Sequence, residues 1–179
     1  MKSRTMVKKV VNLLYCLILP VACTAQNSNQ PLTLDPAFDA TIKSYIDFTV
    51  PILTCEELHR NREDYLVLDA REMEEFEISH LADALFVGYK EFDYSKIADV
   101  AKSRPIVVYC SIGYRSEKIG EKLKNRGFSQ VYNLYGSIFE WTNRGYPLVD
   151  STGQRTQRIH TYNKKWSRWV DAEGVEKVW

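Results

Sequence analysis

Hydrophobic positions between residues 50 and 150 fall into short apolar runs separated by segments of mixed polar and apolar character. The first of these runs is continuously apolar, as expected of a strand that is buried on both faces of a sheet, and four runs are predicted to be strands. They are residues 65–70, 84–87, 105–110 and 130–134. The four segments with a helical pattern are residues 71–78, 93–102, 116–126 and 137–144. This alternation predicts an α/β fold with a mainly parallel sheet and helices on both faces.

Two more helices are predicted before the first of these strands. A helix over 35–46 is expected because its first residue is an aspartate followed by a proline, which is typical of a helix start. Thr54 and Glu57 have the spacing of a capping box, in which each side chain binds the backbone N–H of the other residue. This box predicts a short helix that ends at about Arg60.

Residues 151–179 differ from the preceding region and hold three of the four tryptophans. Within this Trp-rich extension, residues 166–170 and 175–179 flank a turn that contains a glycine, a pattern that predicts a β-hairpin. Aromatic residues at such spacing usually cover an exposed edge or an apolar face of their own domain. Binding to a partner or to a membrane surface is the alternative, and we expect packing.

Residues 1–25 have the pattern of an export signal. They contain four basic residues, no acidic residue and an apolar stretch shorter than the roughly 20 residues of a membrane-spanning helix. Cleavage after Ala25 is one outcome. Lipidation of Cys23 is the other, because residues 19–23 resemble a bacterial lipobox apart from Pro20. We therefore expect an exported bacterial protein that is either periplasmic or anchored to a membrane as a lipoprotein.

The remainder of the chain is expected to be one domain over 49–150, preceded by a polar spacer and helix over 26–48 and followed by the extension over 151–179. Residues 26–179 carry 20 basic and 23 acidic side chains, so their formal charge is near −3. This mildly acidic balance lacks the basic footprint of a nucleic-acid-binding protein. A membrane contact is expected only through a lipid on the N-terminal segment.

Outside the signal, only Cys55 and Cys110 remain. Two thiols can form a disulfide in an oxidising compartment, which leaves a redox role as one hypothesis. Cys55 stands at a predicted helix start, and an ordinary structural residue is the simpler interpretation. The chain has three histidines and no Cys-x-x-Cys, so no metal and no cofactor are expected.

Cys110 is the strongest candidate for a reactive residue because it ends the clearest predicted strand. Ligands of parallel α/β sheets bind beyond the carboxyl ends of the strands. The following loop leads into a helix, whose first N–H groups favour an anion and lower the pKa of a thiol. Gly113 lets the loop curl, and Arg115 adds positive charge. A buried, inert cysteine would require neither residue, so we predict that Cys110 is a thiolate nucleophile.

Residues 51–150 resemble a single rhodanese domain through three blocks in matching order. The blocks are residues 69–71 with 75–76 and 79–81, then 107–116, then 134–136 with Trp141 and 145–147. The chain departs from the family at Ser79, Asp83 and Ser137, where glycine is usual. The resemblance implies a five-stranded sheet of the rhodanese-like fold.

The resemblance also implies sulfurtransfer through a persulfide on Cys110, from thiosulfate or a related small anion to cyanide or a thiol. The loop of six residues over 110–115 matches the sulfur-handling members, whereas phosphatases of this fold have one residue more. Backbone N–H groups that would hold the anion come from Ser111, Ile112, Gly113 and Tyr114, with the side chains of Ile112 and Tyr114 shaping access. The alternative is a domain that binds a partner or carries a persulfide without turnover.

Asp69, Arg71 and Glu75 are expected to support this loop. Arg115 is expected to pair with Asp69 or Glu75, and Arg71 with acidic residues of the helix that follows it. His80 is expected to be architectural, since a thiolate requires no general base.

Overall fold

The computed structural model describes residues 30–179. The predicted export signal, with Cys23 and the two fates proposed for it, lies outside the described residues. Within the described part of the chain, no helix has the length and apolar character needed to cross a membrane.

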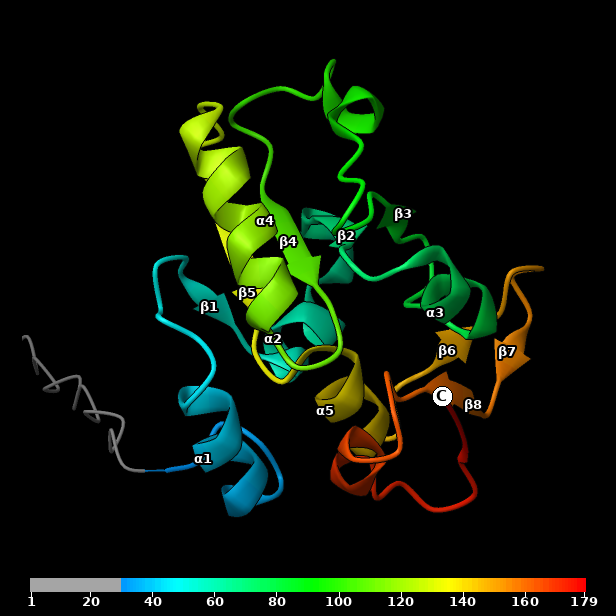
Figure 1. The fold of residues 1–179 in the computed structure, drawn as a ribbon. Helices are drawn as coiled ribbons and strands as arrows, with labels where there is room; N and C mark the ends of the chain where they lie inside the picture. Colours follow the sequence, from blue (N-terminus) through cyan, green and yellow to red (C-terminus); the bar gives the residue numbers. More distant parts are fainter. Residues whose placement is uncertain (1–29) are drawn as a thin grey trace, which may run out of the picture. The chain divides into compact units, whose positions relative to one another are not determined.

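A sheet of five parallel strands forms the centre of the structure (Figure 1). Its order is β1 (Ile52–Leu53), β5 (Val131–Leu134), β4 (Ile106–Tyr109), β2 (Leu66–Asp69) and β3 (Leu85–Phe86). The predicted mainly parallel sheet is confirmed, and all four predicted strands lie in it. The short edge strand β1 was not among them, because two residues are too few to form a recognisable apolar run.

Helices cover both faces of this sheet, as predicted. On one face lies α4 (Tyr114–Asn125), whose Ile119 belongs to the same buried cluster as Val108 of β4. On the other face, Ile138 shares a buried cluster with Val107. The helices of this second cluster are α1 (Pro36–Lys43), α2 (Cys55–Arg60) and α5 (Ser137–Asn143). The short helix α3 (Met73–Ile78) follows β2, and η1 (Arg62–Asp64) is a single 3-10 turn.

The two predicted helix starts before the sheet are confirmed in their local contacts. The Asp35 side chain accepts a hydrogen bond from the backbone N–H of Ala37 at 2.7 Å. At the start of α2, Thr54 Oγ1 accepts from Glu57 N–H, and the Glu57 carboxylate accepts from Thr54 N–H. Both caps satisfy N–H groups that the first helical turn leaves without partners.

The predicted helix over 93–102 is wrong. Only a 3-10 turn, η2 (Tyr94–Ile97), forms in this segment. Ile97 is its one buried residue, so the segment has no apolar stripe with which a longer helix would pack.

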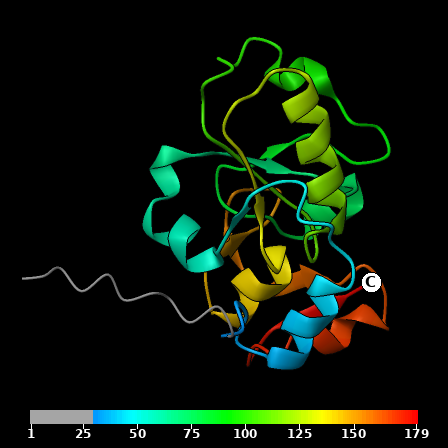
Figure 2. The ribbon, with the colours of Figure 1, turned by 90° about the vertical axis from the view of Figure 1, so that its left-hand side faces the viewer.

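The predicted hairpin in the Trp-rich extension is also wrong. Its first half is a 3-10 turn, η3 (Trp166–Trp169), and its second half contains β9 (Glu176–Val178), which pairs in parallel with β8 (Arg158–His160). The Trp169 ring packs on α1, where it stacks on Phe38 with ring centroids 5.4 Å apart. Figure 2 shows η3, in orange, beside α1, in blue.

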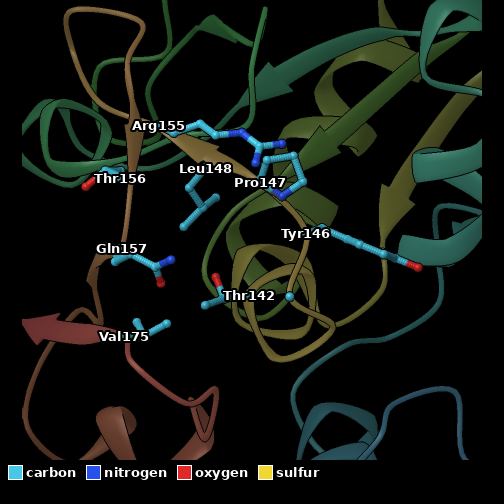
Figure 3. Close-up of a pocket in the computed structure, with 9 residues that line it drawn as sticks. Thr142, Tyr146, Pro147, Leu148, Arg155, Thr156, Gln157 and Val175 are labelled. Carbon is cyan, nitrogen blue, oxygen red and sulfur yellow. The ribbon is translucent and has the colours of Figure 1, made fainter.

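The extension packs on its own domain, as expected. Its first strand, β7 (Arg155–Thr156), pairs antiparallel with β6 (Leu148–Val149), which precedes the extension. Asn143 of α5 then donates to the Trp169 carbonyl and accepts from Asp171 N–H, both at 2.8 Å. A pocket of about 280 Å³ lies between α5 and the extension, with Thr142, Leu148 and Gln157 among its lining residues (Figure 3). It contains neither a thiol nor an acidic side chain.

Candidate active site

Cys110 lies directly after β4, at the carboxyl end of the central strand of the sheet. The chain turns at once into α4, which begins at Tyr114, two residues earlier than predicted. The turn depends on Gly113, whose φ of +125° is a conformation that side chains with a Cβ rarely adopt. The predicted loop thus has its expected place, with Cys110 at its start and Arg115 in the first helical turn.

Two hydrogen-bond donors contact the Cys110 sulfur atom. It accepts a hydrogen bond from Gly113 N–H at 3.2 Å, and Ser116 Oγ lies 3.5 Å away. Burial disfavours the thiolate, but the charge of Arg115 and the donors from Ser116 and Gly113 outweigh it and hold the pKa of Cys110 below that of an ordinary thiol. A larger fraction of Cys110 is therefore a nucleophilic thiolate near neutral pH.

Asn133 of β5 binds both the loop and the first turn of α4. Its Nδ2 donates to the Gly113 carbonyl at 2.9 Å, and its Oδ1 accepts from Ser116 Oγ at 2.6 Å. The Ser116 hydroxyl has one proton, so donation to Asn133 competes with donation to the Cys110 sulfur. Neither Asn133 nor Ser116 was predicted from the sequence to belong to the site, although a polar residue inside a largely buried strand is a usable signal of such a role.

Arg115 is held by Glu75. Two hydrogen bonds of 2.5 and 2.8 Å join its guanidinium to the Glu75 carboxylate, and a third of 2.8 Å joins it to Ser111 Oγ. Burial raises the pKa of Glu75, but the hydrogen bonds and charge of Arg115 lower it to about 2. Of the two partners expected for Arg115, the structure places Glu75 in contact, and Asp69 pairs elsewhere.

Asp69 pairs with Arg71 in a fully buried ion pair at 2.7 Å. The expectation that Arg71 binds acidic residues of the following helix is wrong. The chain folds back after β2, so the Arg71 backbone N–H and Nε reach Asp69 Oδ1 at 2.9 and 3.0 Å. Arg71 also donates to the Ser79 carbonyl at 2.6 Å, which fixes both ends of α3 and thereby the position of Glu75.

Two of the three departures from the family pattern adopt the backbone conformation of a glycine. Asp83 and Ser137 have φ of +57° and +51°, whereas Ser79 is extended. Ser137 gains a contact in return, because its Oγ accepts a hydrogen bond from Cys110 N–H at 3.1 Å. This hydroxyl fixes the backbone of Cys110 from the start of α5.

Cys55 and His80 lie apart from this chemistry. Cys55 is buried against the carbonyl oxygens of Tyr135 and Ser137, both 3.6 Å from its sulfur atom. Both described cysteines are free, so the disulfide of the redox hypothesis is not formed. His80 stacks on Phe76, with its Nδ1 3.0 Å from the Phe76 carbonyl oxygen.

A pocket of about 530 Å³ opens in front of Cys110. The loop residues Ser111, Ile112 and Tyr114 line it, as expected from their position. Several other lining residues were not anticipated from the sequence: Tyr45, Glu72, Tyr89, Lys90, Tyr162 and Trp166. Over residues 30–179, no group of three or more His, Cys, Asp or Glu side chains is arranged to hold a metal ion.

Known proteins with related sequences carry the same domain. The rhodanese-like domain profile matches residues 54–144. The thiosulfate sulfurtransferase GlpE of Coxiella burnetii is 33% identical over 81 residues, which cover 45% of this chain and 74% of that protein. A sulfurtransferase of Allochromatium vinosum is 32% identical over 91 residues, covering 51% and 84%. A tRNA uridine(34) hydroxylase of Wigglesworthia glossinidia brevipalpis is 26% identical over 151 residues, covering 79% and 42%.

Solved structures agree in fold. The rhodanese-like domain of Anabaena superposes with a TM-score of 0.53 at 23% identity, covering 59% of this chain and 83% of that one. A thiosulfate sulfurtransferase of Pseudomonas aeruginosa superposes with a TM-score of 0.51 at 24% identity, covering 68% and 23%. The five-stranded parallel sheet, the loop that follows β4 and the matched profile lead to one conclusion: this chain belongs to the rhodanese-like family.

Proposed function

We propose that the protein is a sulfurtransferase in which Cys110 carries sulfur as a persulfide, from thiosulfate or a related small donor to cyanide or a thiol. The observation that carries this proposal is the environment of the Cys110 sulfur atom. The sulfur atom is buried, yet the charge of Arg115 and the donors from Ser116 and Gly113 hold the pKa of Cys110 below the ordinary value of a thiol.

The reaction proceeds in two displacements. The Cys110 thiolate attacks the outer sulfur of the donor, the S–S bond of thiosulfate breaks, and its electron pair leaves with sulfite. The terminal sulfur of the persulfide then carries the negative charge beside the N–H groups of the loop and the start of α4. An acceptor attacks that terminal sulfur, and the electron pair of the breaking S–S bond returns to the sulfur atom of Cys110.

The alternative is a module that binds a partner or carries persulfide without turnover. The relatives named as tRNA uridine(34) hydroxylases are consistent with rhodanese-like sequences that serve other activities. Turnover is favoured here because the pocket in front of Cys110 has room for an acceptor as well as a donor.

The decisive experiment measures the intact mass of the full chain before and after incubation with thiosulfate. We expect a gain of one sulfur atom, located at Cys110 by peptide mapping, which cyanide removes as thiocyanate. The Cys110→Ser variant should gain none, and the matched Cys55→Ser variant should behave as the wild type. If the chain takes up sulfur from no sulfane donor, the proposal is contradicted. If it takes up one sulfur atom and releases it to no acceptor, the persulfide carrier without turnover is favoured.

We further propose that the chain is exported, on the basic and apolar pattern of residues 1–25. Fractionation of bacterial cells that express the full chain tests export. Metabolic labelling with a fatty acid, which Cys23→Ser should abolish, distinguishes lipidation from cleavage after Ala25. Retention of the full-length chain in the cytoplasm would contradict both fates.

A further inference from the structure

The pocket in front of Cys110 has an aromatic wall that comes from outside the region matched by the family profile. Tyr45 follows α1, whereas Tyr162 and Trp166 belong to the Trp-rich extension. All three lie outside residues 54–144. The loop that carries the nucleophile and the wall that faces it therefore have separate origins in the sequence.

The wall is ordered by specific contacts. Tyr45 and Trp166 meet edge to face, with ring centroids 5.2 Å apart. The Tyr162 ring lies 5.3 Å from the guanidinium carbon of Arg115, the residue that also binds Glu75. Tyr162 N–H donates to His160 Nδ1 at 3.1 Å. The extension thus reaches the catalytic loop directly.

The same rings leave apolar surface facing the pocket. Tyr45 is 44% exposed and Tyr162 is 54% exposed, while Cys110 is only 1% exposed. A partner of Cys110 therefore needs a narrow reactive end that enters the pocket. Its remaining body meets aromatic rings, which stack on flat, apolar groups.

The charges of the pocket favour a neutral body for this partner. Arg115 is already paired with Glu75, and the exposed Lys90 lies 4.0 Å from the Glu72 carboxylate. No positive side chain of the pocket is thus left in excess for a second anionic group. The volume of about 530 Å³ falls in the range of sites for organic ligands, roughly 300–1,000 Å³.

We propose that the sulfur acceptor is a small organic thiol with a neutral aromatic body, which lies against Tyr45, Tyr162 and Trp166. This inference rests on the proposed function, since it names the acceptor of the same persulfide. The acceptor thiol releases its proton to water, and its thiolate attacks the terminal sulfur on Cys110. A new S–S bond forms on the acceptor, the bond to the cysteine sulfur breaks, and its electron pair restores the Cys110 thiolate.

The test compares two acceptors in which the same ethanethiol group carries either a phenyl ring or a methyl group. The full chain is turned over with thiosulfate as donor, and kcat/KM is measured for phenylethanethiol and for propanethiol. We expect phenylethanethiol to be preferred by about tenfold, and Tyr162→Gly to reduce this ratio about fivefold. Glycine suits the φ of +66° at this position, so the change removes the ring without adding backbone strain. Tyr162→Phe retains the ring and should retain the ratio.

A second variant and a control complete the design. Tyr45→Ala should also lower the ratio, whereas Trp179→Ala, which removes an exposed ring of the extension outside the pocket, should not. Equal kcat/KM for the two thiols, or a ratio unchanged in both Tyr162→Gly and Tyr45→Ala, would overturn the inference. A cysteine-containing peptide that outperforms phenylethanethiol would overturn it in favour of a protein acceptor. Failure of sulfur loading before any acceptor is added would refute the proposed function, so the two failures are distinguishable.

Discussion

Cys55 and Cys110 are almost equally buried, with exposed fractions of 2% and 1%, yet the groups around their sulfur atoms have opposite polarity. The Cys110 sulfur atom faces N–H donors and a nearby guanidinium. The Cys55 sulfur atom faces carbonyl oxygens, which accept a hydrogen bond from its S–H group and do not stabilise a negative charge. The comparison shows that burial does not decide whether a thiol is reactive, and that the polarity of its neighbours does.

A position at the start of a helix does not decide whether a thiol is reactive either. Cys55 is the first residue of α2, where the helix dipole alone would favour a thiolate. Burial nevertheless raises the pKa of Cys55 well above the ordinary value, and the charge of Glu140 adds to this effect. The sign of the nearby charge, Arg115 beside Cys110 and Glu140 beside Cys55, together with the hydrogen-bond partners of each sulfur atom, therefore separates the two cysteines.

The largest expected effect is a difference in alkylation between the two thiols. At pH 7, iodoacetamide should modify Cys110 at least about a thousandfold faster than Cys55, because only the thiolate reacts and Cys55 does not line the pocket. Peptide mapping of the full chain measures both rates. In denaturant the two rates should become similar, and similar rates in the folded protein would break the comparison.

The second prediction removes the carboxylate that holds Arg115 beside Cys110. Glu75 has a pKa of about 2 instead of 4.5, so its ionised form stabilises the folded state by about 3 kcal/mol at neutral pH. This contribution is complete above pH 4.5 and is lost as the pH falls toward 2. Glu75→Gln should therefore lower the free energy of unfolding by about 3 kcal/mol at pH 7 and by progressively less in acid.

Denaturant unfolding at a series of pH values measures this difference. Glu77→Gln is the matched control, because Glu77 is exposed on the same helix α3 and should show little change. If the difference in the free energy of unfolding between the wild type and Glu75→Gln stays constant from pH 7 to pH 3, the lowered pKa of Glu75 is contradicted.

The smallest effect is expected for Ser116→Ala. Its hydroxyl proton is shared between the Cys110 sulfur at 3.5 Å and Asn133 Oδ1 at 2.6 Å, and the shorter bond takes the larger share. We expect alkylation of Cys110 at pH 6 to slow by only about two- to threefold, measured against the exposed Ser129→Ala as control. A loss of tenfold or more would make Ser116 the main stabiliser of the thiolate.

The loop over residues 110–115 was predictable because its signals are local. A buried strand, a cysteine at its end, Gly113 and Arg115 follow one another within ten residues, and each has a direct physical meaning. The partner of Arg115 was predictable only as one of two acids, because the choice depends on how β2 turns into α3. Asp69 was taken by Arg71, a contact between residues two positions apart that periodicity does not reveal.

The wall of the pocket was not predictable in the same way. Tyr45, Tyr162 and Trp166 are brought together by packing of the extension on α1, which no spacing in the sequence encodes. The pattern of tryptophans indicated a packed extension, but its glycine-containing turn suggested a hairpin that does not form. Contacts between distant segments override such local turn preferences.

The dependence of the wall on Trp166 has a consequence for biosynthesis. Strands β1 to β5, the Cys110 loop and α5 are complete once residue 143 has been made. Tyr162 and Trp166, whose rings line the pocket, are synthesised later. The loop that carries Cys110 is therefore synthesised before the two rings of the extension that we propose to contact the sulfur acceptor.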